Sequence, residues 1–100
     1  MEYRRGLYNS YYTLEGLEEM VRVNFYYKEG CWLCDSAQEM LNGLKVRHDL
    51  RVDKVDIESD DDLYELYRFD IPVFEFKDGS LLNGRIKKKD LLAVCIKNKR

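Results

Sequence analysis

The chain of 100 residues has little of several features that mark large classes of protein. Its longest strongly apolar run, Leu91 to Ile96, is far too short to cross a bilayer. It also lacks a basic excess, because 19 acidic residues outweigh 17 basic ones and give a formal net charge of −2. Nucleic-acid-binding domains usually carry surplus positive charge. We therefore expect neither a nucleic-acid partner nor a membrane.

Cysteine is scarce as well, with three in the chain. An odd count, without the apolar segment of a secretory signal near the N-terminus, is typical of a reducing compartment rather than a disulfide scaffold. We therefore expect a cytoplasmic protein. Two of the three, Cys31 and Cys34, are separated by two residues. In a reducing compartment such a close pair indicates redox chemistry or metal binding.

The hydrophobic fraction of 45% is enough for one globular domain with a modest core. We place this domain at residues 21–100 and expect it to be a monomer. Residues 1–20 are predicted to be an N-terminal extension rich in tyrosine. Thr13 is a plausible N-cap for a short helix there, and a frayed extension is the other interpretation.

The first half of the domain has the pattern strand, helix, strand. Arg22 to Tyr27 is rich in β-branched and aromatic residues, which predicts a strand. A helix follows, in which apolar residues spaced by three or four positions share one face: Cys34, Ala37, Leu41 and Leu44. Leu50 to Ile57 is the second predicted strand. A helix between two strands favours a parallel pair with a right-handed crossover.

The second half adds a helix, a hairpin and a final helix. Ser59 is the expected N-cap of the short helix. A strand from Ile71 to Phe76 is followed by Asp78-Gly79, a hairpin turn signal, and the last helix is predicted at Lys88 to Lys97. This order (β-α-β-α-β-β-α) predicts an α/β fold, with a mixed four-stranded sheet and helices on both faces.

Three motifs occur in a recognisable order. They read Gly30-Cys31-Trp32-Leu33-Cys34-Asp35, then Val55-Asp56-Ile57, then Ile71-Pro72-Val73. Over residues 22–97 the chain resembles the thioredoxin-like superfamily, and most closely the small glutaredoxin-like proteins. The resemblance implies a thioredoxin-like fold and a thiol–disulfide oxidoreductase.

In that interpretation Cys31 is the nucleophile and Cys34 the resolving thiol. Cys31 would begin a helix, where unpaired N–H groups and the helix dipole favour a thiolate, and Lys28 adds a nearby positive charge. The resemblance implies that the Ile71–Pro72 bond is cis and faces the cysteines. It would leave the backbone of Ile71 free to pair with a substrate strand.

The remaining substrate-binding candidates are Trp32, as an aromatic lip, and Arg85, which would pair with a carboxylate of glutathione. The sequence departs from thioredoxins and from many glutaredoxins at two positions, and these departures limit the mechanism and the substrate that we expect. Phe25 occupies the position where thioredoxins carry a buried acid, so a thioredoxin-type proton relay is not expected. The glycine pair of many glutathione-using glutaredoxins is reduced to Gly84, so glutathione binding stays open. The expected substrates are protein disulfides or glutathione mixed disulfides. No cofactor is required, and the reductant would be glutathione or a reductase protein.

Two other functions compete with this one. A non-catalytic adaptor would keep the fold and use the groove at Pro72 to bind a partner. A metal or iron–sulfur carrier would use the thiols as ligands, and on ligand type Cys31, Cys34, Cys95 and His48 form a conceivable zinc set. We expect no metal, because a strand-to-helix context is unusual for a structural zinc site. Cys95 is expected to be a small buried core residue.

Overall fold

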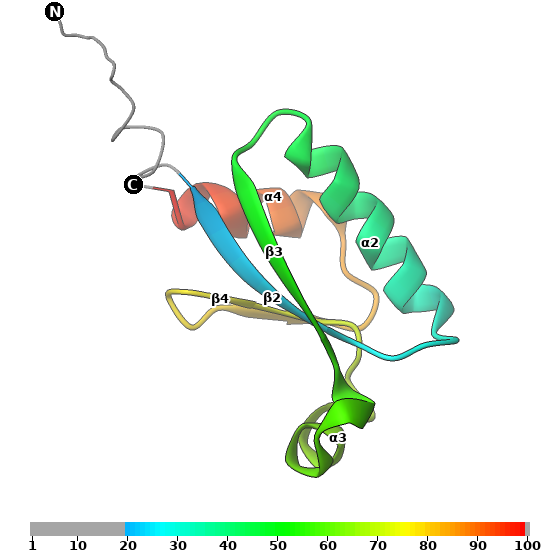
Figure 1. The fold of residues 1–100 in the computed structure, drawn as a ribbon. Coiled ribbons are helices and arrows are strands. Elements are labelled where there is room, and N and C mark those ends of the chain that lie inside the picture. Colours follow the sequence, from blue (N-terminus) through cyan, green and yellow to red (C-terminus); the bar gives the residue numbers. More distant parts are fainter. Residues whose placement is uncertain (1–19, 100) are drawn as a thin grey trace, which may run out of the picture.

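The computed structural model describes residues 20–99, and the expected N-terminal extension lies outside the described residues apart from Met20. Seven elements and one 3₁₀ turn follow one another from Val21 to Lys97 (Figure 1). They are β2 (Val21–Tyr27), α2 (Trp32–Lys45), β3 (Leu50–Asp56), η1 (Ile57–Ser59), α3 (Asp61–Tyr67), β4 (Val73–Phe76), β5 (Leu81–Asn83) and α4 (Lys88–Lys97). None of the helices within residues 20–99 is long and apolar enough to cross a membrane.

The four strands form one mixed sheet in the order β3-β2-β4-β5. β2 and β3 are parallel, as a strand-helix-strand unit requires, with Val23 opposite Val52. β4 runs antiparallel to β2 and to β5, so the Asp-Gly turn closes the expected hairpin. The predicted mixed four-stranded α/β sheet is confirmed.

One face of the sheet carries the hydrophobic core. Alternate residues of β2 and β4 point into it, because successive side chains of a strand face opposite sides. The core cluster joins these residues to the apolar stripes of α2 and α4: Val21, Val23, Phe25, Phe74, Phe76, Ala37, Leu41, Leu44, Leu91 and Cys95, among others. Cys95 is fully buried there, as expected. Both helices therefore lie over this face of the sheet (Figure 1).

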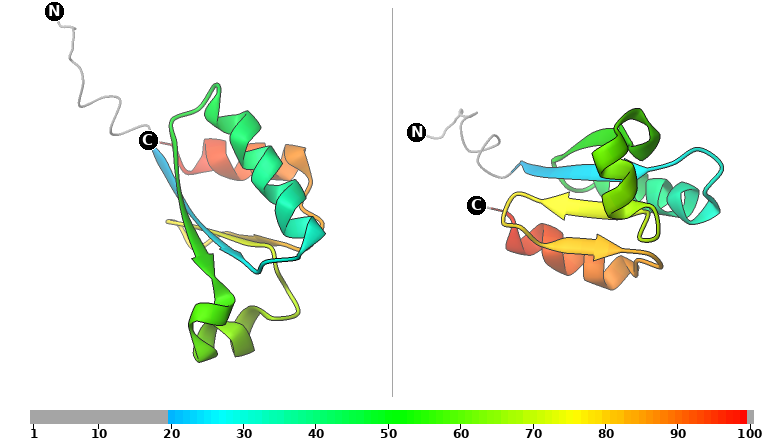
Figure 2. Two further views of the ribbon diagram at one scale, coloured as in Figure 1. Left: turned by 45° about the vertical axis from the view of Figure 1, so that its right-hand side comes forward. Right: turned by 90° about the horizontal axis from the view of Figure 1, so that it is seen from below.

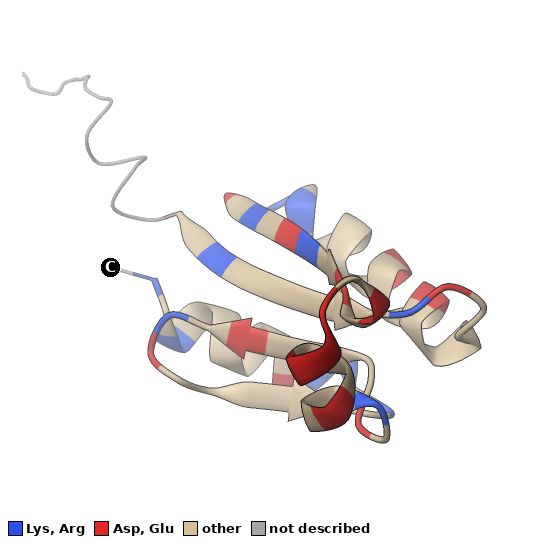
Figure 3. Ribbon diagram, turned by 60° about the horizontal axis from the view of Figure 1, so that its bottom comes forward, with Lys and Arg blue, Asp and Glu red and all other residues tan. Residues whose placement is uncertain are grey.

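Within residues 20–99, α3 is the helix on the opposite face, so the expectation of helices on both faces holds (Figure 2). α3 has seven residues, and none of them is buried. Tyr67 of α3 stacks on Tyr26 of β2, with ring centroids 4.7 Å apart. The first turn of α3 is acidic (Figure 3). Acidic side chains there favour helix formation, because they face the positive end of the helix dipole.

Three predicted boundaries were wrong. Asp60, not Ser59, is the N-cap of α3, and its carboxylate accepts hydrogen bonds from the N–H groups of Asp62 and Leu63. Ile57 leaves the strand for the 3₁₀ turn η1. β4 begins at Val73 rather than at Ile71, because the Ile71 N–H donates to the Tyr67 carbonyl and not to a strand.

Candidate functional site

Cys31 is the N-cap of α2. Its backbone is extended (φ −97°, ψ 107°), and its sulfur accepts a hydrogen bond from the Cys34 N–H at 3.2 Å. Gly30, with φ +79°, supplies the left-handed turn that brings the chain from β2 to this position. Cys31 is partly exposed. The sulfur thus lies at the positive end of a helix of 14 residues, accepts a backbone hydrogen bond and remains accessible.

Cys34 lies one turn further along α2 and is 3% exposed. Burial, and secondly a hydrogen bond to Cys31, raise the pKa of the Cys34 thiol from 9.0 to about 12, against a smaller lowering by the Lys28 backbone. Cys34 is therefore a neutral thiol near neutral pH. The two cysteines therefore differ: Cys31 is partly exposed, and Cys34 is packed in the core cluster, on the apolar helix face that the sequence predicted for it.

The Ile71–Pro72 bond is cis, as the resemblance implied. Pro72 is buried and Ile71 is partly buried against the core cluster that also contacts Cys31. The Gly84 N–H donates to the Pro72 carbonyl at 3.0 Å. The Ile71 N–H is already donated to Tyr67, so the expectation of a fully free Ile71 backbone was wrong. Among the backbone hydrogen bonds outside the regular elements of residues 20–99, none uses the Ile71 carbonyl.

Trp32 and Arg85 lie together. The Arg85 guanidinium carbon is 5.1 Å from the centroid of the Trp32 ring, which is 62% exposed as an aromatic lip should be. The pair borders a groove of about 150 Å³ between α2 and the segment before α4. The other lining residues are Leu33, Ser36, Ala37, Met40, Gly84 and Ile86.

Sequence reasoning did not single out Ser36 and Met40 as groove residues. A signal was present, since Trp32, Ser36 and Met40 follow at intervals of four and so form one stripe on the helix.

Lys28 lies between β2 and Cys31, and its backbone lowers the pKa of the Cys34 thiol by less than burial raises it. Phe25 is buried at the position of the expected missing acid and meets Phe74 edge to face, with centroids 5.2 Å apart. An aromatic ring thus fills the space where an acid would have to be buried.

The conceivable zinc set is not brought together. Cys31 precedes α2 and His48 follows it, and 14 residues at 1.5 Å each separate them by about 21 Å. The His48 ring nitrogen Nδ1 instead lies 2.9 Å from the Lys99 amine. Within residues 20–99, no group of three or more His, Cys, Asp or Glu side chains is arranged to hold a metal ion.

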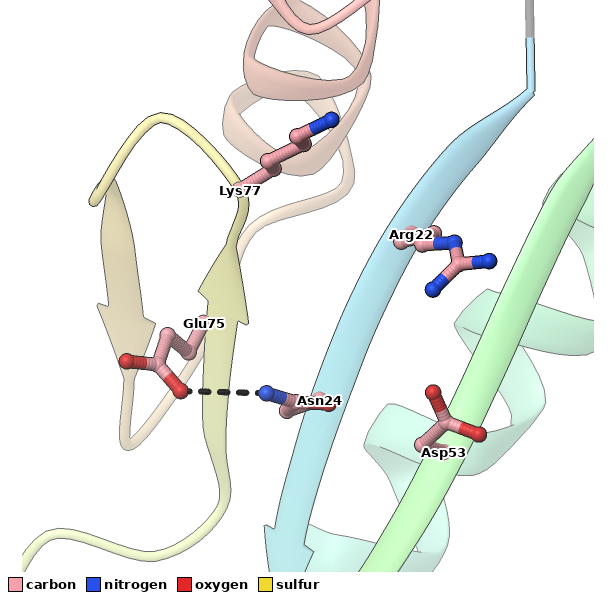
Figure 4. A pocket seen from close by; sticks show the side chains of 5 residues that line it. All are labelled: Arg22, Asn24, Asp53, Glu75 and Lys77. Carbon is pink, nitrogen blue, oxygen red and sulfur yellow. Dashed lines mark hydrogen bonds between the residues drawn. The ribbon is translucent and has the colours of Figure 1, made fainter.

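A second groove, of about 290 Å³, lies on the same side of the sheet as α3, over side chains from β2, β3 and β4 (Figure 4). Its lining residues carry both signs of charge: Arg22, Asn24, Asp53, Glu75 and Lys77. The Asn24 amide donates to Glu75 Oε1 at 3.2 Å. This mixture of charges does not favour an anionic or a cationic ligand. The groove lies on the opposite face of the sheet from Cys34.

The protein-family model described as Glutaredoxin-like domain (DUF836) matches residues 22–95 of this chain. The match includes both cysteines, the cis-proline segment and most of α4.

Solved structures share the fold. A structural-genomics target protein from X. campestris is 25% identical with a TM-score of 0.65, and the alignment covers 75% of this chain and 96% of that one. A mutant thioredoxin from Halobacterium salinarum NRC-1 is 20% identical with a TM-score of 0.66, covering 80% and 75%. A protein from Nitrosomonas europaea solved by NMR is 21% identical with a TM-score of 0.62, covering 74% and 88%.

Proposed function

The chain belongs to the glutaredoxin-like domain family, and on that premise we propose that it is a thiol–disulfide oxidoreductase with Cys31 as nucleophile and Cys34 as resolving thiol. The observation that carries the proposal is the asymmetry of the pair. The Cys31 sulfur accepts the Cys34 N–H at the start of α2, while the Cys34 thiol is buried behind it. Only one of the two sulfurs is thereby both at the start of the helix and in a partly exposed residue.

In the first step the Cys31 thiolate attacks one sulfur of a substrate disulfide. A new disulfide forms between Cys31 and that half of the substrate, and the other half leaves as a thiolate that takes a proton from water. The positive end of the α2 dipole stabilises the attacking charge. Cys34 does not compete at this stage, because its pKa of about 12 keeps it protonated.

In the second step the Cys34 sulfur attacks the Cys31 sulfur and breaks its bond to the substrate half, and the Cys34 proton passes, directly or through water, to the departing substrate thiolate. The substrate half leaves as a thiol, and the pair ends as a Cys31–Cys34 disulfide. The substrate has gained two electrons, and the protein has lost them. Two thiol equivalents, from glutathione or from a reductase protein, return the pair to the reduced state.

Substrate binding is proposed to use the surface around Cys31. Trp32 and Arg85 form one side of it, with the Arg85 guanidinium available to a carboxylate of a peptide or of glutathione. The Ile71 carbonyl and Pro72 form the other side, and Lys28 adds positive charge. Protein disulfides and glutathione mixed disulfides are the proposed substrates, and a reducing cytoplasm is the proposed location.

The test is a redox titration of the full chain in graded dithiothreitol buffers, with free thiols labelled by iodoacetamide and counted by mass spectrometry. We expect Cys31 and Cys34 to gain and lose their labels together, as one two-electron couple. Cys31→Ser should abolish the couple, whereas the matched Cys95→Ser variant should keep it. Cys34→Ser should stop at the first step and accumulate a mixed disulfide with an added peptide disulfide.

The rival functions give different outcomes. Thiols that stay reduced in every buffer, with no mixed disulfide in Cys34→Ser, would contradict the oxidoreductase and favour the adaptor. Metal or iron–sulfur cluster bound stoichiometrically to the freshly purified protein, and lost in Cys31→Ser, would favour the carrier.

A further inference from the structure

An aromatic stack joins α3 to the sheet. The Tyr67 ring lies on the Tyr26 ring of β2, with centroids 4.7 Å apart and planes 30° apart. α3 is a single short helix without a buried residue, and such a helix depends on packing for its position. Figure 2 shows it lying across the sheet on the side away from α2 and α4. The stack therefore contributes to the position of the end of α3 relative to the strands.

Tyr26 is itself held in place by polar contacts between strands. Its hydroxyl donates to Glu75 Oε1 at 2.8 Å, and the Asn24 amide donates to the same oxygen. Burial and the neighbouring Glu75 raise the pKa of Tyr26 to about 12, so the hydroxyl keeps its proton and its role as a donor at neutral pH. The surface on which Tyr67 stacks is thus fixed to both β2 and β4.

The backbone of Tyr67 is hydrogen-bonded to the segment that contains the cis-proline. Its carbonyl accepts the N–H of Asp70 at 2.8 Å and the N–H of Ile71 at 3.2 Å. On the other side, the Gly84 N–H holds the Pro72 carbonyl. Tyr67 thus holds Ile71 through the Ile71 N–H. The carbonyl of the same residue is the acceptor that the proposed function assigns to a substrate strand.

We propose that Tyr67 is a positioning residue for peptide substrates. Its ring, stacked on Tyr26, fixes the end of α3, and its carbonyl fixes Ile71 for pairing with the backbone of a protein or peptide disulfide. The inference rests on the proposed function and deepens it. Binding of an extended peptide disulfide depends on the stack of Tyr67 on Tyr26. Binding of a disulfide too small to reach Ile71 does not.

The experiment compares two disulfides with the full chain. One is a synthetic peptide of about ten residues with a central mixed disulfide, and the other is hydroxyethyl disulfide, which has no peptide backbone. Tyr67→Ala removes the stack. A backbone hydrogen bond contributes about 1 kcal/mol, so we expect KM for the peptide to rise about fivefold with kcat unchanged. The rate with hydroxyethyl disulfide should stay at the wild-type value.

Two controls separate positioning from general destabilisation. Tyr67→Phe keeps the ring and should restore the wild-type KM. Tyr64→Ala removes another α3 tyrosine, whose ring lies against Arg68 at 5.2 Å, and should leave KM unchanged. If Tyr67→Ala does not fold, Tyr26→Leu removes the same stack from the strand side, and the same rise in KM is expected.

An unchanged peptide KM in the folded stack-deleted variant overturns the positioning role while the oxidoreductase stands. An equal loss of rate with both disulfides overturns it too, because it would indicate damage to the cysteines. Wild-type protein that reduces neither disulfide overturns the proposed function itself.

Discussion

Raising the pH should destabilise the reduced protein through Cys34. The folded-state pKa of Cys34 is about 12, against 9.0 for an ordinary cysteine. Between these values the unfolded chain releases this proton and the folded chain keeps it. The folded state therefore binds more protons, and the free energy of unfolding falls as the pH rises. Below about pH 9 the group is protonated in both states and contributes no pH dependence.

The size of the effect follows from the shift. Each pH unit above the unfolded-state pKa of 9.0 lowers the free energy of unfolding by about 1.4 kcal/mol for one group. At about pH 10.5 the protein has therefore lost about 2 kcal/mol of stability. No large discount for solvent screening applies, since Cys34 is 3% exposed. A single domain is stable by about 5–15 kcal/mol, so this loss is a measurable fraction of the total.

The assay is urea unfolding followed by circular dichroism at about pH 8 and about pH 10.5, with a phosphine reductant to keep the cysteines free. Tyr26 and Cys95 also have raised pKa values and act in the same direction, so wild type must be compared with Cys34→Ala. Between the two pH values the free energy of unfolding of Cys34→Ala should fall by about 2 kcal/mol less than that of wild type. Ser36→Ala, an exposed change on the same helix, should keep the wild-type dependence. Parallel pH curves for wild type and Cys34→Ala would refute the reasoning.

Three further predictions concern the scaffold. Asp60→Ala should lower the free energy of unfolding by about 1 kcal/mol in urea titrations because α3 loses its cap, and Asp61→Ala, which removes a charge but no cap bond, should cost less. Phe74→Ala should cost about 4 kcal/mol in the same assay, because Phe74 is fully buried, and a loss below about 1 kcal/mol would contradict its place in the core. Hydrogen bonding to the Ser80 N–H lowers the pKa of Asp78 to about 2, so this group stabilises the fold above about pH 4 and stops doing so as the pH falls through about 2. Asp78→Asn should therefore flatten the acid side of the stability curve measured by thermal unfolding, and an unchanged acid side would contradict it.

Much of the fold could be predicted from the sequence because the signals are local. The alternation in β2, the helical stripe through Cys34 and the Asp-Gly turn each predict one element, and all three elements are present. The boundary errors have a local cause too. Ser59 and Asp60 are adjacent capping residues, and the choice between them depended on the 3₁₀ turn that follows β3. Because Ser59 and Asp60 have similar N-cap propensities, their residue types alone do not show which of them caps α3.

The candidate site divides in the same way. Cys31 at a helix start was predictable, because the strand, the glycine and the helical stripe surround it in the chain. The stack of Arg85 on Trp32 was not, since the two residues are far apart in sequence and meet only when the segment before α4 packs beside α2. The loss of a free Ile71 N–H was also missed, although its acceptor, the Tyr67 carbonyl, lies only four residues earlier at the end of α3.

By itself, the sequence determined the order of strands and helices, the family and the placing of two thiols at a helix start, because these depend on residue types within a few positions of one another. The contact of Tyr67 with Tyr26 between α3 and the sheet, and the groove that Trp32 and Arg85 border, came from the tertiary structure alone. The physical reason is that stacking and the shape of a groove come from packing between elements, and packing joins residues that local propensity treats as independent.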